Sequence, residues 1–307
     1  CVVADDQDGR SEVVDGCLEG DFLLFAGAGT IDRFARRVVD GLCARNDRLG
    51  RLTRFFQALT GRPNPGEILR VNEPLARKTT IGVGGSAELY AEPSSIEDLQ
   101  TLLAAAHESE LPVRVLGRGS NLIVPDEGVI GLVLRLQHAN WRRITELTDH
   151  RIQVGGGVRL KELCGRALRE GWEGFEFLEG IPGTLGGALR MNAGAMGGWI
   201  FEVVEEVQLV TLTGEIRILR REDLNVGYRR CADIADAIAI GGVLRPASPT
   251  DHRAIKARIE DYRNRRQEAQ PREPSAGCIF RNPEGDTAGR LIDELGLKGE
   301  RVGDAEV

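Results

Sequence analysis

The sequence predicts an α+β protein in which strands outnumber helices. Its 307 residues, 41% of them hydrophobic, suffice for two or three domains with buried cores. Short apolar or alternating runs predict strands at 87 to 91, 112 to 116, 131 to 136 and 151 to 154. Glycine is frequent, with 39 residues against 12 prolines, which is typical of tight turns and close backbone approaches rather than of linker.

The first element is a strand, a glycine turn and a helix. The apolar run FLLFA at 22 to 26 ends at the GAG turn of residues 27 to 29, and apolar residues then recur at helical spacing up to Leu42. Such a turn can present amides to a phosphate, but taken alone it is better explained as a chain reversal. Residues 44 to 70 change character, with an amphipathic stretch followed by GRPNPG, and we place a domain boundary there.

The next elements form a βαβ unit, because a helix separates the strands at 87 to 91 and 112 to 116. Ser95, with Glu97 and Asp98 behind it, is typical of the start of that helix. Further along, the sequence predicts a helix near 159 to 170, a hairpin across Thr213 and Gly214, a charged helix at 253 to 269, a strand at 278 to 281 and a helix near 287 to 295, with a second domain boundary near 246 to 252.

Charge and cysteine usage exclude several classes. A formal net charge of −7 without a basic run argues against a general nucleic-acid or membrane binder, although it does not exclude a local basic pocket. The six cysteines form no CxxC pair and no metal spacing with the four histidines, which indicates a reducing cytoplasm and no structural metal. No apolar stretch approaches the roughly 18 residues that span a bilayer. Because the chain opens on Cys1, we expect sequence to be missing before it.

Two glycine-rich loops are the strongest functional signals. GRGSNLIV at 117 to 124 follows an apolar strand, and its amides from Gly117 to Asn121 are predicted to form a nest for a pyrophosphate; the alternative is a sharp strand connection. EGIPGTLGGALRMNAGA at 179 to 195 is almost uncharged, so it is predicted to lie against a flat apolar ring; the alternative is helix packing against its glycines. TTIGVGGSAE at 79 to 88 matches GxGxxG only weakly, because no apolar strand precedes it.

Several blocks in order resemble one enzyme family. NEPLARKTTIGVGG, VLGRGSNLIVPDEG, FEFLEGIPGTLGGALRMNAGA, VGYRR, SAGCIFRNPEG and AGRLIDELGLKGERVGDAEV occur at spacings similar to those of UDP-N-acetylenolpyruvoylglucosamine reductases, over residues 72 to 307. The resemblance implies a vanillyl-alcohol-oxidase-type FAD-binding domain at 71 to 247 and an incomplete α+β substrate-binding domain at 248 to 307. It also implies a cytoplasmic enzyme that reduces an enolpyruvyl UDP-sugar with NADPH, through FAD, to UDP-N-acetylmuramate for peptidoglycan synthesis.

The resemblance assigns the cofactor to the two strong loops and the chemistry to two later blocks. Arg229 would grip the substrate carboxylate, and Cys278, where the family carries a serine, would donate the proton; a surface arginine and a buried cysteine are the plain alternatives. Tyr228, Arg281 and Asn282 would contact the substrate. The FAD residues implied are Gly117, Arg118, Gly119, Ser120, Asn121, Leu122, Ile181, Pro182, Gly183, Thr184, Gly186, Gly187, Asn192, Ala193, Gly194 and Ala195.

Both ends of the chain carry expectations of their own. The family has a catalytic glutamate roughly seventy residues beyond the proton donor, past Val307, so we expect this chain to bind FAD and to turn over poorly. GDFLLFAGAGTIDRFARRVVDGL resembles the last strand and helix of UDP-N-acetylmuramate:L-alanine ligases, which predicts a ligase remnant at 1 to 43, with 44 to 70 as a tether, in a fusion of two pathway enzymes. The alternatives are another flavoprotein oxidase or dehydrogenase of the same fold and a flavin-binding module without turnover.

Overall fold

The computed structural model describes residues 47–62, 68–247, 251–269, 273–275, 277 and 279–307. The strand, turn and helix predicted before residue 43, with the ligase-like segment, lie outside the described residues, and so does Cys278. No helix in the described part of the chain is both long and apolar enough to cross a membrane. The longer helices are α3 (Asp47–Leu59), α4 (Ile96–Glu108), α5 (Leu160–Glu170) and α7 (His252–Ala269).

A four-stranded sheet carries the first glycine loops. Its order is β1-β2-β4-β3, with β4 parallel to both neighbours, and α4 connects β2 to β3, so the predicted βαβ unit is confirmed. The predicted helix start is confirmed as well, because Ser95 and Asp98 form a reciprocal capping box. The strands are β1 (Ile68–Pro74), β2 (Ser86–Glu92), β3 (Val113–Val115) and β4 (Val129–Leu134).

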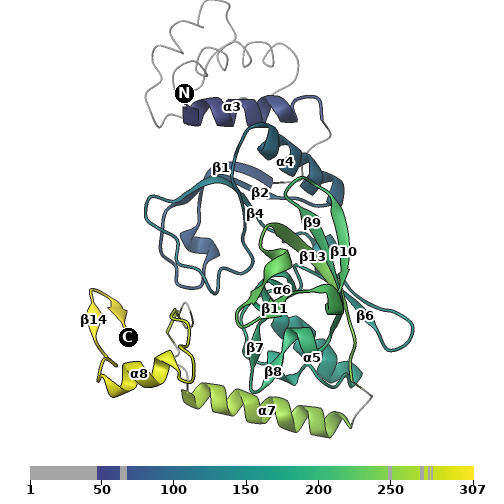
Figure 1. Cartoon of the computed structure of the whole chain (residues 1–307), viewed down its shortest axis with the longest axis vertical. Helices are drawn as coiled ribbons and strands as arrows, with labels where there is room; N and C mark the ends of the chain where they lie inside the picture. Colours follow the sequence, from purple (N-terminus) through teal and green to yellow (C-terminus); the bar gives the residue numbers. More distant parts are fainter. Residues whose placement is uncertain (1–46, 63–67, 248–250, 270–272, 276, 278) are drawn as a thin grey trace, which may run out of the picture.

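Helix α3 lies within the stretch that the sequence assigns to a tether. Its amphipathic pattern buries Leu52 and Phe55 in one cluster with apolar residues of α4, β2 and β4. Figure 1 shows α3 against α4 at one end of the molecule. Residues 47 to 59 therefore contribute to a folded core, while the domain limits proposed from the sequence stay predictions.

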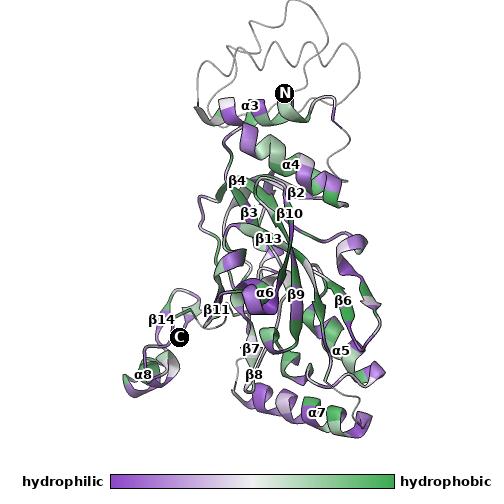
Figure 2. Cartoon of the chain, turned by 45° about the vertical axis from the view of Figure 1, so that its right-hand side comes forward, coloured by the Kyte–Doolittle hydropathy of each residue, from purple (hydrophilic) through white to green (hydrophobic). Residues whose placement is uncertain are grey.

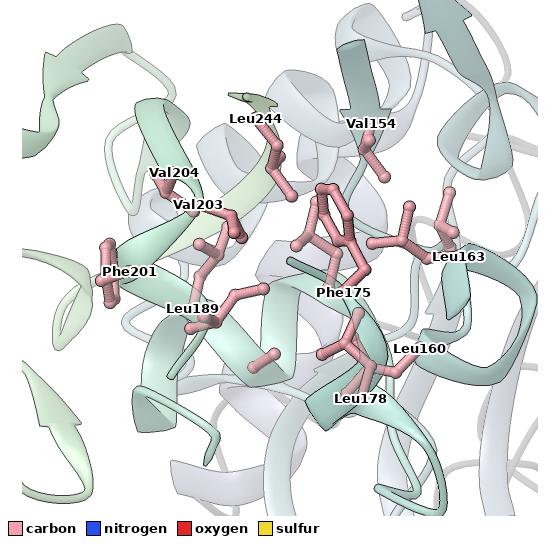
Figure 3. Close-up of a cluster of buried hydrophobic side chains, with 14 of the residues drawn as sticks. Val154, Leu160, Leu163, Phe175, Leu178, Leu189, Phe201, Val203, Val204 and Leu244 are labelled. Atoms are coloured by element: carbon pink, nitrogen blue, oxygen red, sulfur yellow. The ribbon is translucent and has the colours of Figure 1, made fainter. Parts of the chain in front are cut away.

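The second sheet is antiparallel and has the order β10-β9-β13-β6-β5. Helices α5, α6 (Leu185–Met191) and α7 contribute to the core beside it, and Figure 3 shows Phe175 in the middle of that core among Val154, Leu163 and Leu244. This packing holds the turn that begins the second strong glycine loop. The strands are β5 (Ile144–Glu146), β6 (Ile152–Gly155), β9 (Val204–Thr211), β10 (Ile216–Arg220) and β13 (Ala237–Leu244).

One predicted strand is wrong. Residues 279 to 281 form no strand, and the side chains of Ile279 and Phe280 are 69% and 62% exposed, because no neighbouring strand pairs with this segment. The helix predicted after it is confirmed as α8. The remaining elements are short: η1 (Ala76–Lys78), η2 (Ala139–Arg142), η3 (Glu176–Leu178), β7 (Gly194–Ala195), β8 (Gly198–Trp199), η4 (Ile200–Glu202), η5 (Arg221–Asp223), β11 (Val226–Gly227), β12 (Arg230–Cys231), η6 (Ala232–Ile234), α8 (Ala288–Glu294), β14 (Arg301–Val302) and β15 (Ala305–Glu306).

Candidate functional site

The three glycine-rich loops meet in space, although about a hundred residues of sequence separate the first from the last. The amide of Thr80 donates to the carbonyl of Gly119 at 3.0 Å, which joins the first loop to the second. The hydroxyl of Ser120 donates to the carbonyl of Pro182 at 3.0 Å, which joins the second to the third. The structure thus brings together the segments that the sequence predicts to bind one extended cofactor.

The 117 to 124 loop leaves its backbone donors unused. Among the described residues, none of the five amides from Gly117 to Asn121 donates a hydrogen bond to another protein group. Gly119 has φ +64°, and a Cβ there would lie 2.5 Å from the carbonyl oxygen of Lys78, so only glycine fits. Unpaired successive amides on a surface loop are suited to the oxygens of a pyrophosphate.

A polar network supports this loop from the sheet side. The Nε of Arg135 donates to the carbonyl of Gly117 at 3.1 Å. Arg135 also interacts with the hydroxyl of Tyr90, which donates to the carboxylate of Glu92. Burial, followed by the charge of Glu92, raises the pKa of Tyr90 well above its usual range, so the hydroxyl keeps its proton. The ammonium of Lys78 lies 4.3 Å from the centre of the Tyr90 ring.

The glycines of the 179 to 195 loop fall into two groups. A Cβ at Gly186 would lie 2.9 Å from a backbone carbonyl of β13, and one at Gly194 would lie 2.4 Å from an indole ring, so close packing within the protein explains both. A Cβ at Gly183 or Gly187 would have no protein atom nearer than 3.8 Å. The surface that can approach a flat ring is therefore made by Gly183 and Gly187.

Two glycines of the 79 to 88 loop, Gly84 and Gly85, serve the contact between loops. A Cβ at Gly84 would lie 2.2 Å from the carbonyl oxygen of Val124, and one at Gly85 would lie 2.2 Å from that of Asp126. Protein backbone therefore fills the space beside both glycines. The match of this loop to GxGxxG has a packing explanation, as its weak sequence context indicates.

The GYRR segment and the segment after α7 are in contact. Arg229 has φ +55° and donates through Nη1 to the carbonyl of Phe280 at 2.8 Å. Its guanidinium carbon lies 5.5 Å from the centre of the Tyr228 ring, and that side chain is 47% exposed. A Cβ at Gly277 would lie 3.8 Å from Oδ1 of Asn121. The neighbours of position 278 thus reach both the 117 to 124 loop and Arg229.

Two asparagines have partners that the sequence does not reveal. Asn192 ends α6 with φ +43° and donates through Nδ2 to the carbonyl of Gly227, while its buried Oδ1 has no partner among the described residues. Asn282 accepts from the amide of Ala288 at the start of α8, and Arg281 beside it is exposed. The other predicted cofactor residues lie on the same two loops or directly after α6: Arg118, Leu122, Ile181, Thr184, Ala193 and Ala195.

Arg135 is a residue of the site that the sequence-based prediction missed. It directly follows strand β4, whose last four residues are buried, and its bond to Gly117 spans 18 positions. An arginine at the end of a buried strand was the only sequence signal. The hydrogen-bond partner of Arg135 depends on which loop the neighbouring strand of the sheet places beside it. Predicting that partner requires the tertiary structure.

The fold and the site define an FAD-binding protein. The unpaired amides beside open glycine backbone fit a dinucleotide, and residues 87–220 match the family model described as FAD binding domain. Residues 270–307 match the model described as UDP-N-acetylenolpyruvoylglucosamine reductase, C-terminal domain.

Individual relatives agree with both models. The UDP-N-acetylenolpyruvoylglucosamine reductase 2 of Symbiobacterium thermophilum is 43% identical over 245 residues, which cover 80% of this chain and 79% of the relative. The reductase of Geobacter metallireducens is 44% identical over 243 residues, 79% of each chain. The crystal structure of the reductase from Thermus caldophilus matches with a TM-score of 0.66 at 39% identity, over 78% of this chain and 85% of that one. The chain belongs to the UDP-N-acetylenolpyruvoylglucosamine reductase family.

Proposed function

We propose that this protein reduces UDP-N-acetylenolpyruvoylglucosamine to UDP-N-acetylmuramate with NADPH, a step of peptidoglycan synthesis. The observation that carries the proposal is the convergence of the unpaired amides of 117 to 121, the open glycines of 179 to 195 and the contact between Arg229 and Phe280. The names of the relatives support the choice of substrate.

The cofactor site is proposed from the two loops. The amides from Gly117 to Asn121 would hold the pyrophosphate of FAD, and the backbone of Gly183 and Gly187 would lie against the flavin ring. The chemistry that bound FAD supplies is the transfer of hydride from NADPH to the enolpyruvyl double bond. The protein's part is to hold the ring and the substrate in register.

Arg229 is proposed to bind the substrate carboxylate. A guanidinium has five N–H donors, and its bond to Phe280 uses one of them. A second, bidentate contact with a carboxylate would also offset the negative charge that develops when hydride arrives. Tyr228, whose side chain is exposed, is proposed to contact the same substrate.

Cys278 is proposed as the proton donor from its place in the family motif, since it lies outside the described residues. A free thiol has a pKa of about 8.5, so most of it is protonated at neutral pH and it can deliver a proton to carbon. Arg281 and Asn282 are proposed to meet the diphosphate or the sugar. The limits of the domains and the ligase origin of residues 1 to 43 are also proposals, and both rest on the sequence.

The test is a stepwise flavin titration of the whole chain. Purified protein mixed with FAD should retain flavin absorbance after gel filtration, NADPH should bleach it without oxygen, and the enolpyruvyl substrate should restore it. Failure to retain flavin would refute the cofactor assignment. Bleaching without recovery on substrate would instead indicate a flavin module without turnover, and recovery only with oxygen would indicate an oxidase.

The proton donor has a separate test in a chain that turns over. Cys278→Ser should keep or raise activity, because serine can still supply a proton. Cys278→Ala should abolish recovery of the flavin by substrate, while bleaching by NADPH stays unchanged. Equal recovery in all three forms would remove Cys278 from the mechanism.

A further inference from the structure

Helix α7 is held on the FAD-binding domain mainly by charged side chains. Among the described residues of α7, the buried apolar ones are Ile255 and Ile259, both in its first half. The helix is largely hydrophilic in Figure 2, and it packs along η3 and α5. Its second half therefore depends on polar contacts for its place.

The polar contacts of α7 as a whole follow one short stretch of the domain in order. Arg258 lies 3.2 Å from the buried carboxylate of Glu176, and the Nε of Arg263 donates to Glu179 at 2.9 Å. Next, the side chain of Arg266 lies over Gly180, where a Cβ would come within 2.7 Å of its Nε. Three arginines of α7 thus contact Glu176, Glu179 and Gly180 in order along the chain, and the last two residues begin the 179 to 195 loop.

Glu179 is the central residue of these contacts. Its side chain is 16% exposed, and its second carboxylate oxygen faces the thiol of Cys164 on α5 at 3.9 Å. Burial, followed by the charges of Glu179 and Glu176, raises the pKa of Cys164 to about 12, so the thiol stays protonated and can donate to the carboxylate. Arg263, which is hydrogen-bonded to Glu179, and Arg266, whose charge also acts on it, then balance the charge of Glu179.

The chain that leaves α7 returns to the site. Gly277 lies beside Asn121, and the carbonyl of Phe280 accepts the hydrogen bond from Arg229. Phe280 is thus held by Arg229, and both Gly277 and Phe280 follow α7 closely in the sequence. If α7 shifted along residues 176 to 180, Gly277 and Phe280 would move relative to the 117 to 124 loop.

We propose that Arg263 is a positioning residue, which clamps α7 to Glu179 and so fixes Gly277 and Phe280 beside Asn121 and Arg229 for substrate binding. The proposal rests on the proposed function, because it assigns the substrate to the surroundings of these residues. Arg263 contacts Glu179, the first residue of the 179 to 195 loop, but none of the residues proposed to bind FAD, so its effect on the site is indirect. We name Arg263, Glu179 and their ion pair the α7 clamp.

The test compares two arginines of the same helix. Arg263→Gln removes the α7 clamp, whereas Arg265→Gln removes an arginine whose ion pair, with Asp261, lies within α7. Each protein is loaded with FAD, and the enolpyruvyl substrate is titrated while the change in flavin absorbance gives Kd. Arg263→Gln should weaken substrate binding about tenfold with FAD affinity within twofold of the parent, as expected for lost positioning. Arg265→Gln should leave both constants unchanged.

Further variants separate positioning from simple stability. Arg263→Lys keeps a cation within reach of Glu179 and should recover most of the substrate affinity. The double variant that combines Arg263→Gln with Glu179→Gln should bind the substrate no more weakly than the single variant with the lower affinity, because each change removes the same interaction. A lowered Tm with unchanged substrate Kd in Arg263→Gln would overturn the proposal. A parent protein that binds FAD but shows no response to substrate would overturn both this inference and the choice of substrate.

Discussion

Removal of the Arg135 side chain should weaken FAD binding, although Arg135 itself is not expected to contact the cofactor. Arg135 donates to the carbonyl of Gly117 at 3.1 Å, beside the five amides that donate to no described protein group. In Arg135→Ala this carbonyl loses its charged donor, and the Tyr90 hydroxyl loses a cationic neighbour beside Glu92. The peptide that follows Gly117 can then rotate, and the five amides no longer point to one place.

The size of the effect follows from the type of hydrogen bond. A bond from a charged donor contributes about 1.5–3 kcal/mol, and about 1.4 kcal/mol corresponds to a tenfold change in Kd. If most of that energy orders the loop for its ligand, Kd for FAD should rise about 10–100-fold. Arg135→Lys keeps the charge but lacks the planar Nε donor, so it should fall between the parent and Arg135→Ala.

The assay is a titration of apoprotein with FAD, followed by the quenching of flavin fluorescence. Arg114→Ala is the matched control, because it removes an exposed arginine of strand β3 in the same sheet. A Kd for Arg135→Ala within twofold of the parent, with the fold intact by circular dichroism, would refute the view that Arg135 orders the loop.

Three further predictions concern neighbouring parts of the site. Gly187→Leu should fold normally and lose FAD affinity at least tenfold, whereas Gly186→Leu should fail to fold stably, because a Cβ there meets backbone at 2.9 Å; thermal melts with flavin titration check both. Arg258→Ala removes the cation beside the buried carboxylate of Glu176. The free energy of unfolding should therefore fall by about 2 kcal/mol, and Tm should fall by about 4–8 °C in calorimetry. Because the pKa of Cys164 is raised to about 12, its thiolate fraction at pH 8 is about 1000-fold below that of an ordinary thiol. Mass spectrometry should therefore find Cys164 alkylated only after unfolding. The stability that the neutral thiol provides is complete below a pH of about 8.5 and is lost as pH rises toward 12.

Local patterns predicted most of the elements, because each depends on residues close in sequence. The cap of α4 needs only Ser95 and Asp98, which are three positions apart. The strand predicted at 278 to 281 was wrong for a related reason. A short apolar run can become a strand only beside a partner, and the structure gives Phe280 a side-chain donor, Arg229, instead of a neighbouring strand.

The site was predictable as loops but not as individual contacts. Glycine content singled out the segments, yet Gly186 and Gly187 are adjacent, and the sequence cannot tell which one packs on β13 and which faces open space. Arg135 and Arg263 escaped prediction because each acts on a partner 18 or 84 positions away. Their roles depend on how the strands and α7 are placed, which local propensity does not encode.

The arginines of this acidic protein divide into two kinds. Two arginines of α7 that face the domain meet carboxylates, Arg258 with Glu176 and Arg263 with Glu179, so their charge is balanced and serves to hold the helix. Arg135 and Arg229 instead donate to the backbone carbonyls of Gly117 and Phe280, which carry no net charge. No ion pair with a carboxylate is described for either arginine, so we propose that their positive charge is available to an anionic ligand, as FAD and a UDP-sugar are. A chain with a net charge of −7 can in this way build a local basic pocket, because the partner of each arginine, rather than the total charge, decides where an anion binds.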